Sequence, residues 1–260
     1  MEQNTLQQLT IQTSVGKINI LRSPVRQKNL ILLHGLGASL QVWSKLISYI
    51  NKDIGICAID LLGHGASDKP KITYNIFNQI IMLDEVIKKI YPKTATISIM
   101  GNSYGAWVGA AYVSTLTSQE IYNTLILEDM AGFFGYFEDI AALNQNAVKT
   151  YTQNMFNNLI RINNNDEYVM RSILDNMQKD ALSCNTLSKI HSSCLIIWGE
   201  KDIVIDKKYA MKISACIPKS IVKIISGAGH APHYSHAQEI SVIINDFVGK
   251  ENENSYNIKK

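Results

Sequence analysis

The stretch from Ala95 to Ala111 constrains the fold of this chain more than any other. An apolar run, Ala95–Met100, leads into Gly101-Asn102-Ser103-Tyr104-Gly105 and then into the small residues Ala106–Ala111. The run predicts a buried strand and the small residues predict a helix packed closely on it, so the chain must turn sharply at Ser103. Glycine is expected on both sides of the turn because a side chain there would collide with the strand and the helix. The alternative interpretation is a glycine-softened loop whose serine caps the helix.

A serine held on such a turn can act as a nucleophile if a base and an orienting acid lie nearby. Downstream, an apolar strand at Cys194–Trp198 runs into a polar loop that carries Asp202. A later strand, Ile221–Ile225, runs into a glycine-rich loop that carries His230. Both residues follow the carboxyl ends of strands, where parallel sheets place their chemistry. We therefore expect Ser103 as nucleophile, Asp202 as acid and His230 as base, in the chain order that hydrolases of this architecture use.

Two other carboxylates compete for the role of the acid. Asp129 ends the strand Leu125–Glu128, and Glu200 lies two residues before Asp202. Asp202 is favoured because its loop leads directly into the helix that precedes the histidine strand. Asp129 stays open as the alternative acid.

The remaining histidines are less suited to be the base. His34 and His64 precede Ser103 in the chain, and His191 is expected on the surface. His233 follows His230 closely and could line the site, whereas His236 is expected to be solvated near the start of the last helix.

An acyl-transfer site also needs N–H donors for the oxyanion. Tyr104, directly after the nucleophile, offers one backbone N–H, and the loop His34-Gly35-Leu36-Gly37 offers a second at Leu36. Each such donor contributes about 3–4 kcal/mol to the transition state.

The chain resembles the α/β-hydrolase fold family in five segments: His34–Gly37, Asp60–Ser67, Gly101–Gly105, Trp198–Asp202 and Gly229–Pro232. The resemblance extends from about residue 29 to residue 250, apart from a middle insertion. The family usually has proline at the position of Leu62. The resemblance implies a serine hydrolase with the five roles assigned above, and it implies neither a metal nor an organic cofactor. Serine at position 103 argues against the dehalogenases and epoxide hydrolases of the fold, which use aspartate there.

Within the family the chain is most similar to small carboxylesterases, including the enzyme that demethylates pimeloyl-carrier-protein methyl ester in biotin synthesis. That resemblance implies a small-molecule or carrier-protein-linked carboxylic ester as substrate. The C–C hydrolases of meta-cleavage products share the Gly-Asn-Ser pattern but usually have tryptophan where this chain has Ala231. A non-catalytic binding protein is disfavoured because every catalytic position is filled.

Composition sets further bounds. The chain has 260 residues, 46% of them hydrophobic, and a net charge of +3. This charge is too small to indicate a nucleic acid partner, and no apolar run is long enough to span a membrane. The four cysteines form no C-x-x-C pair, and the start of the chain resembles no secretory signal. We expect reduced thiols and a cytoplasmic protein, with the oligomeric state left open.

Strands and helices alternate along most of the sequence. After a hairpin at residues 5–22, we expect strands at 30–33, 54–59, 95–100, 125–128, 194–198 and 221–225. This order predicts an α/β fold with a mostly parallel sheet covered by helices on both faces. Residues 1–129 and 188–248 would form the core, 130–187 a helical lid, and 249–260 a disordered tail. Within the lid, Phe133, Phe134, Tyr136 and Phe137 are expected either to line an acyl pocket or to dock the lid on the core.

Overall fold

A computed structural model describes residues 5–116, 122–143, 150, 153–160 and 165–254 of the chain. Its centre is one sheet in the order β1-β2-β4-β3-β5-β6-β7-β8. The strands are β1 Gln7–Thr13, β2 Gly16–Arg22, β3 Lys28–Leu33, β4 Ile54–Ile59, β5 Thr96–Asn102, β6 Tyr122–Glu128, β7 Ser193–Gly199 and β8 Ser220–Ile225. The β1–β2 and β2–β4 pairs are antiparallel, and every other pair is parallel. This confirms the prediction of a mostly parallel sheet, with strand bounds that differ by a few residues.

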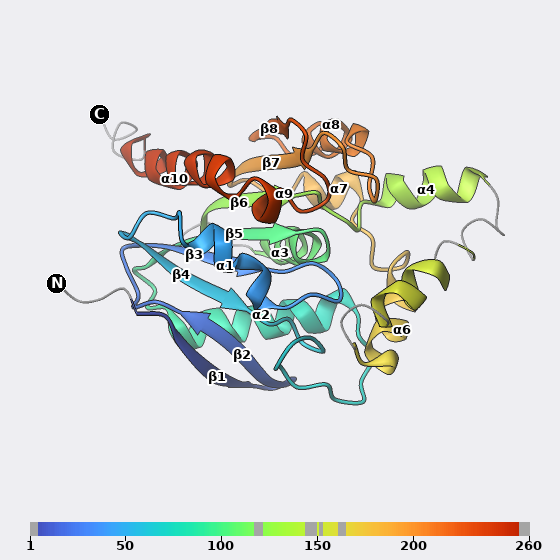
Figure 1. Cartoon of the computed structure of the whole chain (residues 1–260), viewed down its shortest axis with the longest axis horizontal. Helices are drawn as coiled ribbons and strands as arrows, with labels where there is room; N and C mark the ends of the chain where they lie inside the picture. Colours follow the sequence, from blue (N-terminus) through green and yellow to red (C-terminus); the bar gives the residue numbers. More distant parts are fainter. Residues whose placement is uncertain (1–4, 117–121, 144–149, 151–152, 161–164, 255–260) are drawn as a thin grey trace.

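Helices cover both faces of this sheet (Figure 1). They are η1 Leu40–Trp43, α1 Ser44–Ile47, α2 Ile76–Ile90, α3 Tyr104–Thr115, α4 Phe134–Leu143, α6 Glu167–Asn176, α7 Cys184–Leu187, α8 Lys208–Ser214, α9 Pro232–Ser235 and α10 Ala237–Asn254. Residues 153–160 are also helical.

Alternate side chains of each strand point to opposite faces, so the sheet builds two cores. On one face, Ile31, Ile99 and Leu127 join the buried residues of α2, α3 and α8. On the other, Leu32, Met100 and Ile126 join those of η1, α1 and α10. Strands buried on both faces explain why the central strands read as continuous apolar runs in the sequence.

The register of the parallel strands aligns their carboxyl ends. Asn102 of β5 lies opposite Glu128 of β6, and Gly199 of β7 lies opposite Ile225 of β8. The turns that follow these strands therefore meet at one edge of the sheet, and they carry Ser103, Asp129, Asp202 and His230.

The described part of the insertion between β6 and β7 is mainly helical. Figure 1 shows α4 and α6 outside the two helix layers, beyond one end of the sheet. The end of the insertion returns to the core, where Leu182 and Leu187 are buried.

The last helix differs from the sequence-based expectation of a disordered tail. Helix α10 continues through Asn254, so residues 249–254 extend a helix that began in the core. The rest of that predicted tail, 255–260, lies outside the described residues.

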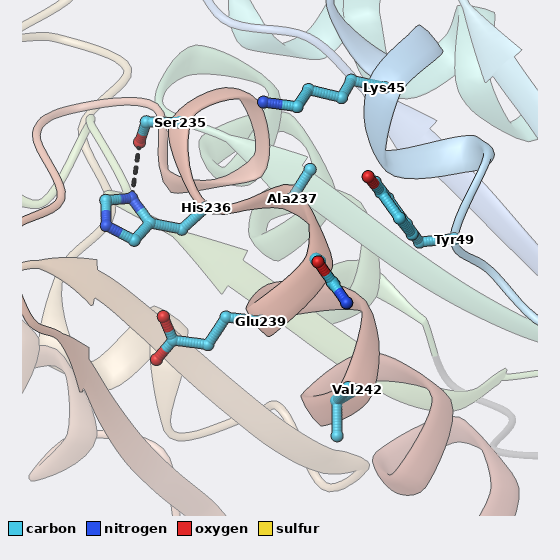
Figure 2. Close-up of a pocket in the computed structure, with 8 residues that line it drawn as sticks. Lys45, Tyr49, Ser235, His236, Ala237, Glu239 and Val242 are labelled. Carbon is cyan, nitrogen blue, oxygen red and sulfur yellow. Dashed lines mark hydrogen bonds between the residues drawn. The ribbon is translucent and has the colours of Figure 1, made fainter.

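A hollow of about 460 Å³ opens beside α1 and the start of α10 (Figure 2). His236 lines it, half-buried, with its Nδ1 2.8 Å from the hydroxyl oxygen of Ser235. Lys45, Tyr49 and Val242 contribute to the same hollow. His236 therefore lies near the start of the last helix, as expected.

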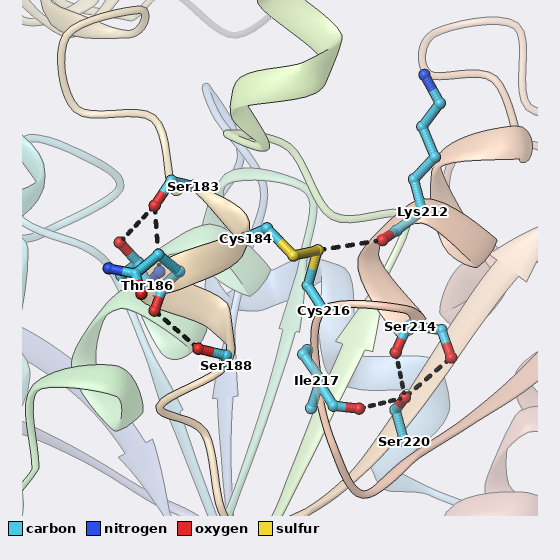
Figure 3. Close-up of a disulfide and its surroundings, with 10 residues drawn as sticks. Ser183, Cys184, Thr186, Ser188, Lys212, Ser214, Cys216, Ile217 and Ser220 are labelled. Carbon is cyan, nitrogen blue, oxygen red and sulfur yellow. Dashed lines mark hydrogen bonds between the residues drawn. A yellow bond between two sulfur atoms is a disulfide. The ribbon is translucent and has the colours of Figure 1, made fainter.

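The expectation of reduced thiols is wrong for two of the four cysteines. Cys184 of α7 and Cys216, just after α8, form a disulfide (Figure 3). Their separation of 32 positions along the chain hides this pair from a search for closely spaced cysteines. Cys57 and Cys194 are free and buried, and burial raises the pKa of the Cys57 thiol to about 12. The disulfide removes the support that the cysteines gave to a cytoplasmic location.

Among the residues that the structure describes, no helix combines the length and the apolar character that a membrane crossing requires.

Candidate active site

Ser103 occupies the sharp turn between β5 and α3. Its φ of 52° and ψ of −111° place a non-glycine residue in a strained conformation, which is typical of functional sites. A Cβ at Gly105 would overlap the carbonyl oxygen of Leu33, and one at Gly101 would overlap the backbone of α3. The two glycines therefore allow strand, turn and helix to pack this closely. The Ser103 N–H donates to the carbonyl oxygen of Glu128 at 2.8 Å, which ties the turn to β6.

Asp202 and His230 form a hydrogen-bonded pair at the ends of β7 and β8. His230 Nδ1 lies 2.7 Å from Asp202 Oδ2. The other carboxylate oxygen of Asp202 accepts the N–H groups of Val204 at 2.7 Å and Ile205 at 3.1 Å. Because a carboxylate can only accept here, Nδ1 carries the proton and Nε2 of the imidazole is left as the basic nitrogen.

The electrostatics of Asp202 favour its ionised form. Burial acts to raise the pKa of this carboxyl, but the hydrogen bond and charge of His230 and the two backbone N–H groups outweigh burial. The net effect holds the pKa of Asp202 below its ordinary value. An ionised acid of this kind can orient the imidazole and stabilise its protonated form.

The serine turn and the histidine loop are also tied to each other. The side-chain amide of Asn102 donates to the carbonyl oxygen of His230 at 3.0 Å. A Cβ at Gly199 would overlap the carbonyl oxygen of Gly229, so the histidine loop runs directly against the end of β7. The three residues expected to perform the chemistry thus lie on loops that share one edge of the sheet.

Asp129, the alternative acid, is adjacent to this pair but is bonded differently. Its Oδ1 accepts the N–H of Gly199 at 2.9 Å, while its Oδ2 is buried without a hydrogen-bond partner among the described residues. Burial, and then the negative charge of Glu128, raise the pKa of Asp129 to about 10. Asp129 is therefore neutral at physiological pH, and Asp202 is the carboxylate that holds His230.

A metal could be considered at this cluster. Potential ligand atoms of Asp129, Asp202 and His230 lie within 4.8 Å of one another. However, His230 Nδ1 and Asp202 are engaged with each other, and Asp129 holds a proton at neutral pH. A cation would have to break the bond between His230 and Asp202 and remove the proton of Asp129. The three side chains therefore suit a hydrogen-bonded pair better than a metal site.

The loop expected to supply an oxyanion donor lies beside the serine. A Cβ placed on Gly35 would lie 3.4 Å from Ser103 Cβ, so the loop carrying Leu36 passes next to Ser103. His34 braces the loop: its Nδ1 bonds to the carbonyl oxygen of Gly35 at 2.8 Å, and its Nε2 accepts the N–H of Leu61 at 3.0 Å. Burial lowers the pKa of His34, so this ring is neutral and structural. Tyr104 begins α3 on the other side of Ser103.

His233 does not take the place expected for it. The residue is buried, with its backbone N–H donating to Glu128 Oε1 at 2.7 Å and its Nδ1 2.5 Å from Glu128 Oε2. It therefore faces the end of β6 instead of lining an open site. Sequence reasoning missed Glu128; the only available signal was an acidic residue at the end of an otherwise apolar strand.

The aromatic residues of the insertion divide into two groups. Phe133 is buried in the core, and Tyr136 packs edge-on against Tyr209 of α8 at 5.3 Å between ring centroids. These two residues dock the insertion. Phe134 is 39% exposed and Phe137 is half-buried, so neither ring is enclosed in the core.

Comparison with known proteins finds hydrolases that are similar to this chain. A monoacylglycerol lipase of Xenopus laevis is 22% identical over 272 residues, covering 91% of this chain and 78% of that protein. The 2-hydroxy-6-oxo-6-(2'-aminophenyl)hexa-2,4-dienoic acid hydrolase of Metapseudomonas resinovorans is 36% identical over 105 residues, covering 39% of this chain and 35% of that protein. Among solved structures, a membrane phospholipase A described as a bacterial virulence factor superposes with a TM-score of 0.79 at 21% identity, covering 95% of this chain and 87% of that one. The sequence model of the alpha/beta hydrolase fold matches residues 28–166, more than half of the chain. The chain therefore belongs to the alpha/beta hydrolase fold family.

Proposed function

We propose that this protein is a serine hydrolase that cleaves a carboxylic ester through an acyl-enzyme. The observation that carries the proposal is the 2.7 Å bond between His230 Nδ1 and Asp202, together with Ser103 on a strained turn tied to the same loop. This is the arrangement that activates a serine hydroxyl, which is otherwise a weak nucleophile.

In the proposed reaction, His230 Nε2 removes the Ser103 proton as the hydroxyl oxygen attacks the ester carbonyl. Asp202 stabilises the imidazolium that forms, and the N–H groups of Leu36 and Tyr104 bind the oxyanion. The imidazolium then gives its proton to the leaving alcohol. Water hydrolyses the acyl-enzyme by the same steps in reverse, with His230 again as the base, and no metal or organic cofactor is required.

The substrate class is proposed on chemical grounds. The lipase and the phospholipase among the similar proteins bear names that imply ester substrates, which favours a carboxylic ester for this chain. The finer hypothesis is a methyl ester carried on a pimeloyl carrier protein, and it rests only on the resemblance of the sequence around His230. In either case, Phe134 and Phe137 are proposed to contact the acyl chain, with residues 130–187 acting as a lid.

A second candidate is hydrolysis of a carbon–carbon bond in a vinylogous diketone. The similarity to a hydrolase of that substrate class over 105 residues favours it, whereas Ala231 after the histidine argues against it. The two reactions use the same nucleophile and differ in the bond that is broken.

The test begins with labelling by a fluorophosphonate probe, which should modify Ser103 and leave a folded Ser103→Ala protein unmodified. A panel of p-nitrophenyl and methyl esters of increasing acyl length, run beside a vinylogous diketone, then identifies the substrate class. Ester turnover that Ser103→Ala abolishes supports the proposal. Turnover of the diketone alone would favour the second candidate, and an inert, unlabelled wild-type protein would indicate a binding function.

A further inference from the structure

Glu128, the last residue of β6, is fully buried and has no part in the proposed reaction. Both oxygens of its carboxyl group bond to one residue, His233: one accepts the backbone N–H at 2.7 Å and the other lies 2.5 Å from Nδ1. A carboxyl group shielded from water is costly unless it is fully hydrogen-bonded. The arrangement therefore holds His233 tightly to the end of β6.

His233 in turn fixes the segment that carries the proposed base. It lies in α9, three residues after His230, and its ring packs against the ring of Trp43 at 4.2 Å between centroids. Trp43 is fully buried in the core on that face of the sheet. Contacts on two sides thus restrict the position of α9, and α9 restricts the loop that precedes it.

The main chain of Glu128 holds the nucleophile as well. Its carbonyl oxygen accepts the N–H of Ser103 at 2.8 Å, and the neighbouring Asn102 donates to the carbonyl oxygen of His230 at 3.0 Å. One residue of β6 therefore contacts the serine turn through its backbone and the histidine segment through its side chain.

We propose that Glu128 is a positioning residue that sets the separation of Ser103 and the His230 imidazole through its two bonds to His233. This inference rests on the proposed function and adds Glu128 to the residues that the proposed reaction depends on. Nucleophile and base must be held in a reactive geometry, and a displacement of about 1 Å can cost about 100-fold in rate. Glu128 contacts neither substrate nor reacting atoms, so its removal should lower kcat and leave KM nearly unchanged.

The primary test compares Glu128→Leu with Glu128→Gln. Leucine removes both bonds, and we expect kcat for p-nitrophenyl acetate to fall by about 10- to 100-fold. Glutamine retains an acceptor for the His233 N–H and can donate to Nδ1 when the imidazole proton moves to Nε2, so it should recover most of the rate. The rate of Ser103 labelling by a fluorophosphonate should follow the same order.

Thr124→Val is the matched control for a loss of stability alone. Thr124 lies near the amino end of the same strand, where its hydroxyl donates to the buried Ser98 hydroxyl at 2.8 Å. This variant should lower the melting temperature without changing kcat of the folded protein. If Glu128→Leu does not fold, the bond between Glu128 and His233 can be tested from its other side. The variants are then His233→Leu and His233→Asn. Asparagine retains a side-chain N–H for Glu128, so it should be the faster of the two.

The outcomes separate this inference from the proposed function. A wild-type protein that is neither labelled nor active overturns the proposed function, and this inference falls with it. An active wild-type protein with folded Glu128→Leu at the wild-type kcat overturns only the role of Glu128. The role of Glu128 is also overturned if Glu128→Gln is as slow as Glu128→Leu. In the second pair, it is overturned if His233→Asn is as slow as His233→Leu.

Discussion

At the scale of single residues, Asp129 and Asp202 are close neighbours with opposite electrostatics. Asp202 accepts three hydrogen bonds, one of them from His230, and they hold its pKa below the ordinary value despite burial. Asp129 accepts one backbone N–H, and burial beside Glu128 raises its pKa to about 10. Neighbouring carboxyl groups whose pKa values are driven apart are typical of sites where one acts as the charged partner.

This contrast predicts different effects of two similar substitutions. Asp202→Asn should lower kcat/KM by about 10⁴-fold, as loss of the orienting carboxylate does in other triads. Asp129→Asn should remain close to wild type because asparagine keeps an acceptor for the Gly199 N–H and replaces a neutral side chain. Steady-state kinetics on a p-nitrophenyl ester would measure both. If the two effects were exchanged, Asp129 would be the acid.

At the scale of elements, α8 and the residues just after it hold the insertion at two places. Asp139 of α4 accepts hydrogen bonds from Tyr209 at 2.6 Å and from Lys212 at 3.0 Å. The disulfide between Cys184 and Cys216 joins α7, at the end of the insertion, to the segment after α8. Neither attachment includes Ser103, Asp202 or His230, so we expect both to affect how the insertion is held and not the bonds within the proposed site.

The disulfide should contribute to stability and little to turnover. Closing a loop of 32 residues in the unfolded chain is expected to stabilise the fold by about 3–4 kcal/mol. Cys184→Ser should therefore lower the urea midpoint while kcat on a short ester stays within about twofold, since no contact of the site is lost. Reductant should lower the midpoint of the wild type to that of the variant and should not affect the variant. An unchanged midpoint for Cys184→Ser would contradict this expectation.

The lid hypothesis is best tested by point substitutions. Removal of residues 130–187 as a block would strip buried side chains such as Val169, Met170 and Leu187 from the core. Phe134→Ala and Phe137→Ala should instead reduce kcat/KM for long acyl esters more than for acetyl esters, because contacts with the remote chain support the transition state.

Phe77→Ala on α2, where the ring is 63% exposed, is the control for loss of an exposed aromatic ring. An unchanged chain-length profile in both α4 variants would assign acyl selectivity to the core.

At the scale of the whole molecule, two apolar cores support the sheet edge that carries the proposed site, and this edge contains buried acidic groups. Asp129 keeps its proton in the folded protein up to about pH 10, whereas in the unfolded chain it loses the proton near about pH 4. Between these values the unfolded state binds fewer protons, so Asp129 makes the fold less stable as pH rises. Neutral Asp129 is therefore a source of instability at physiological pH.

Asp129→Asn should consequently stabilise the protein, and the gain should increase with pH. The upper limit of the increase is about 1.4 kcal/mol for each pH unit between the two pKa values. Urea unfolding at pH 5 and pH 8 would measure it, with Asp175→Asn, an exposed residue of α6, as the control. A gain that is equal at both pH values, or larger at pH 5, would show that Asp129 ionises in the fold.

Local patterns in the sequence were enough to predict the features that depend on neighbouring residues. Apolar runs and glycines located the strands of the parallel sheet, and Ser103, Asp202 and His230 could be chosen because each lies in the turn or loop that follows a strand. The carboxyl ends of parallel strands must meet at one edge, so local patterns were enough to bring these loops together.

Contacts between distant segments, and the burial that shifts the pKa of acidic side chains, are visible only in the three-dimensional structure. Glu128 and His233 are 105 residues apart, and no local pattern indicates that they face each other. Cys184 and Cys216 pair only because α7 packs beside the end of α8. Which of Asp129 and Asp202 bonds to His230, and which is left buried beside another acid, also depends on how the loops pack. These are properties of the three-dimensional environment, because desolvation and hydrogen bonds shift a pKa according to what surrounds the group.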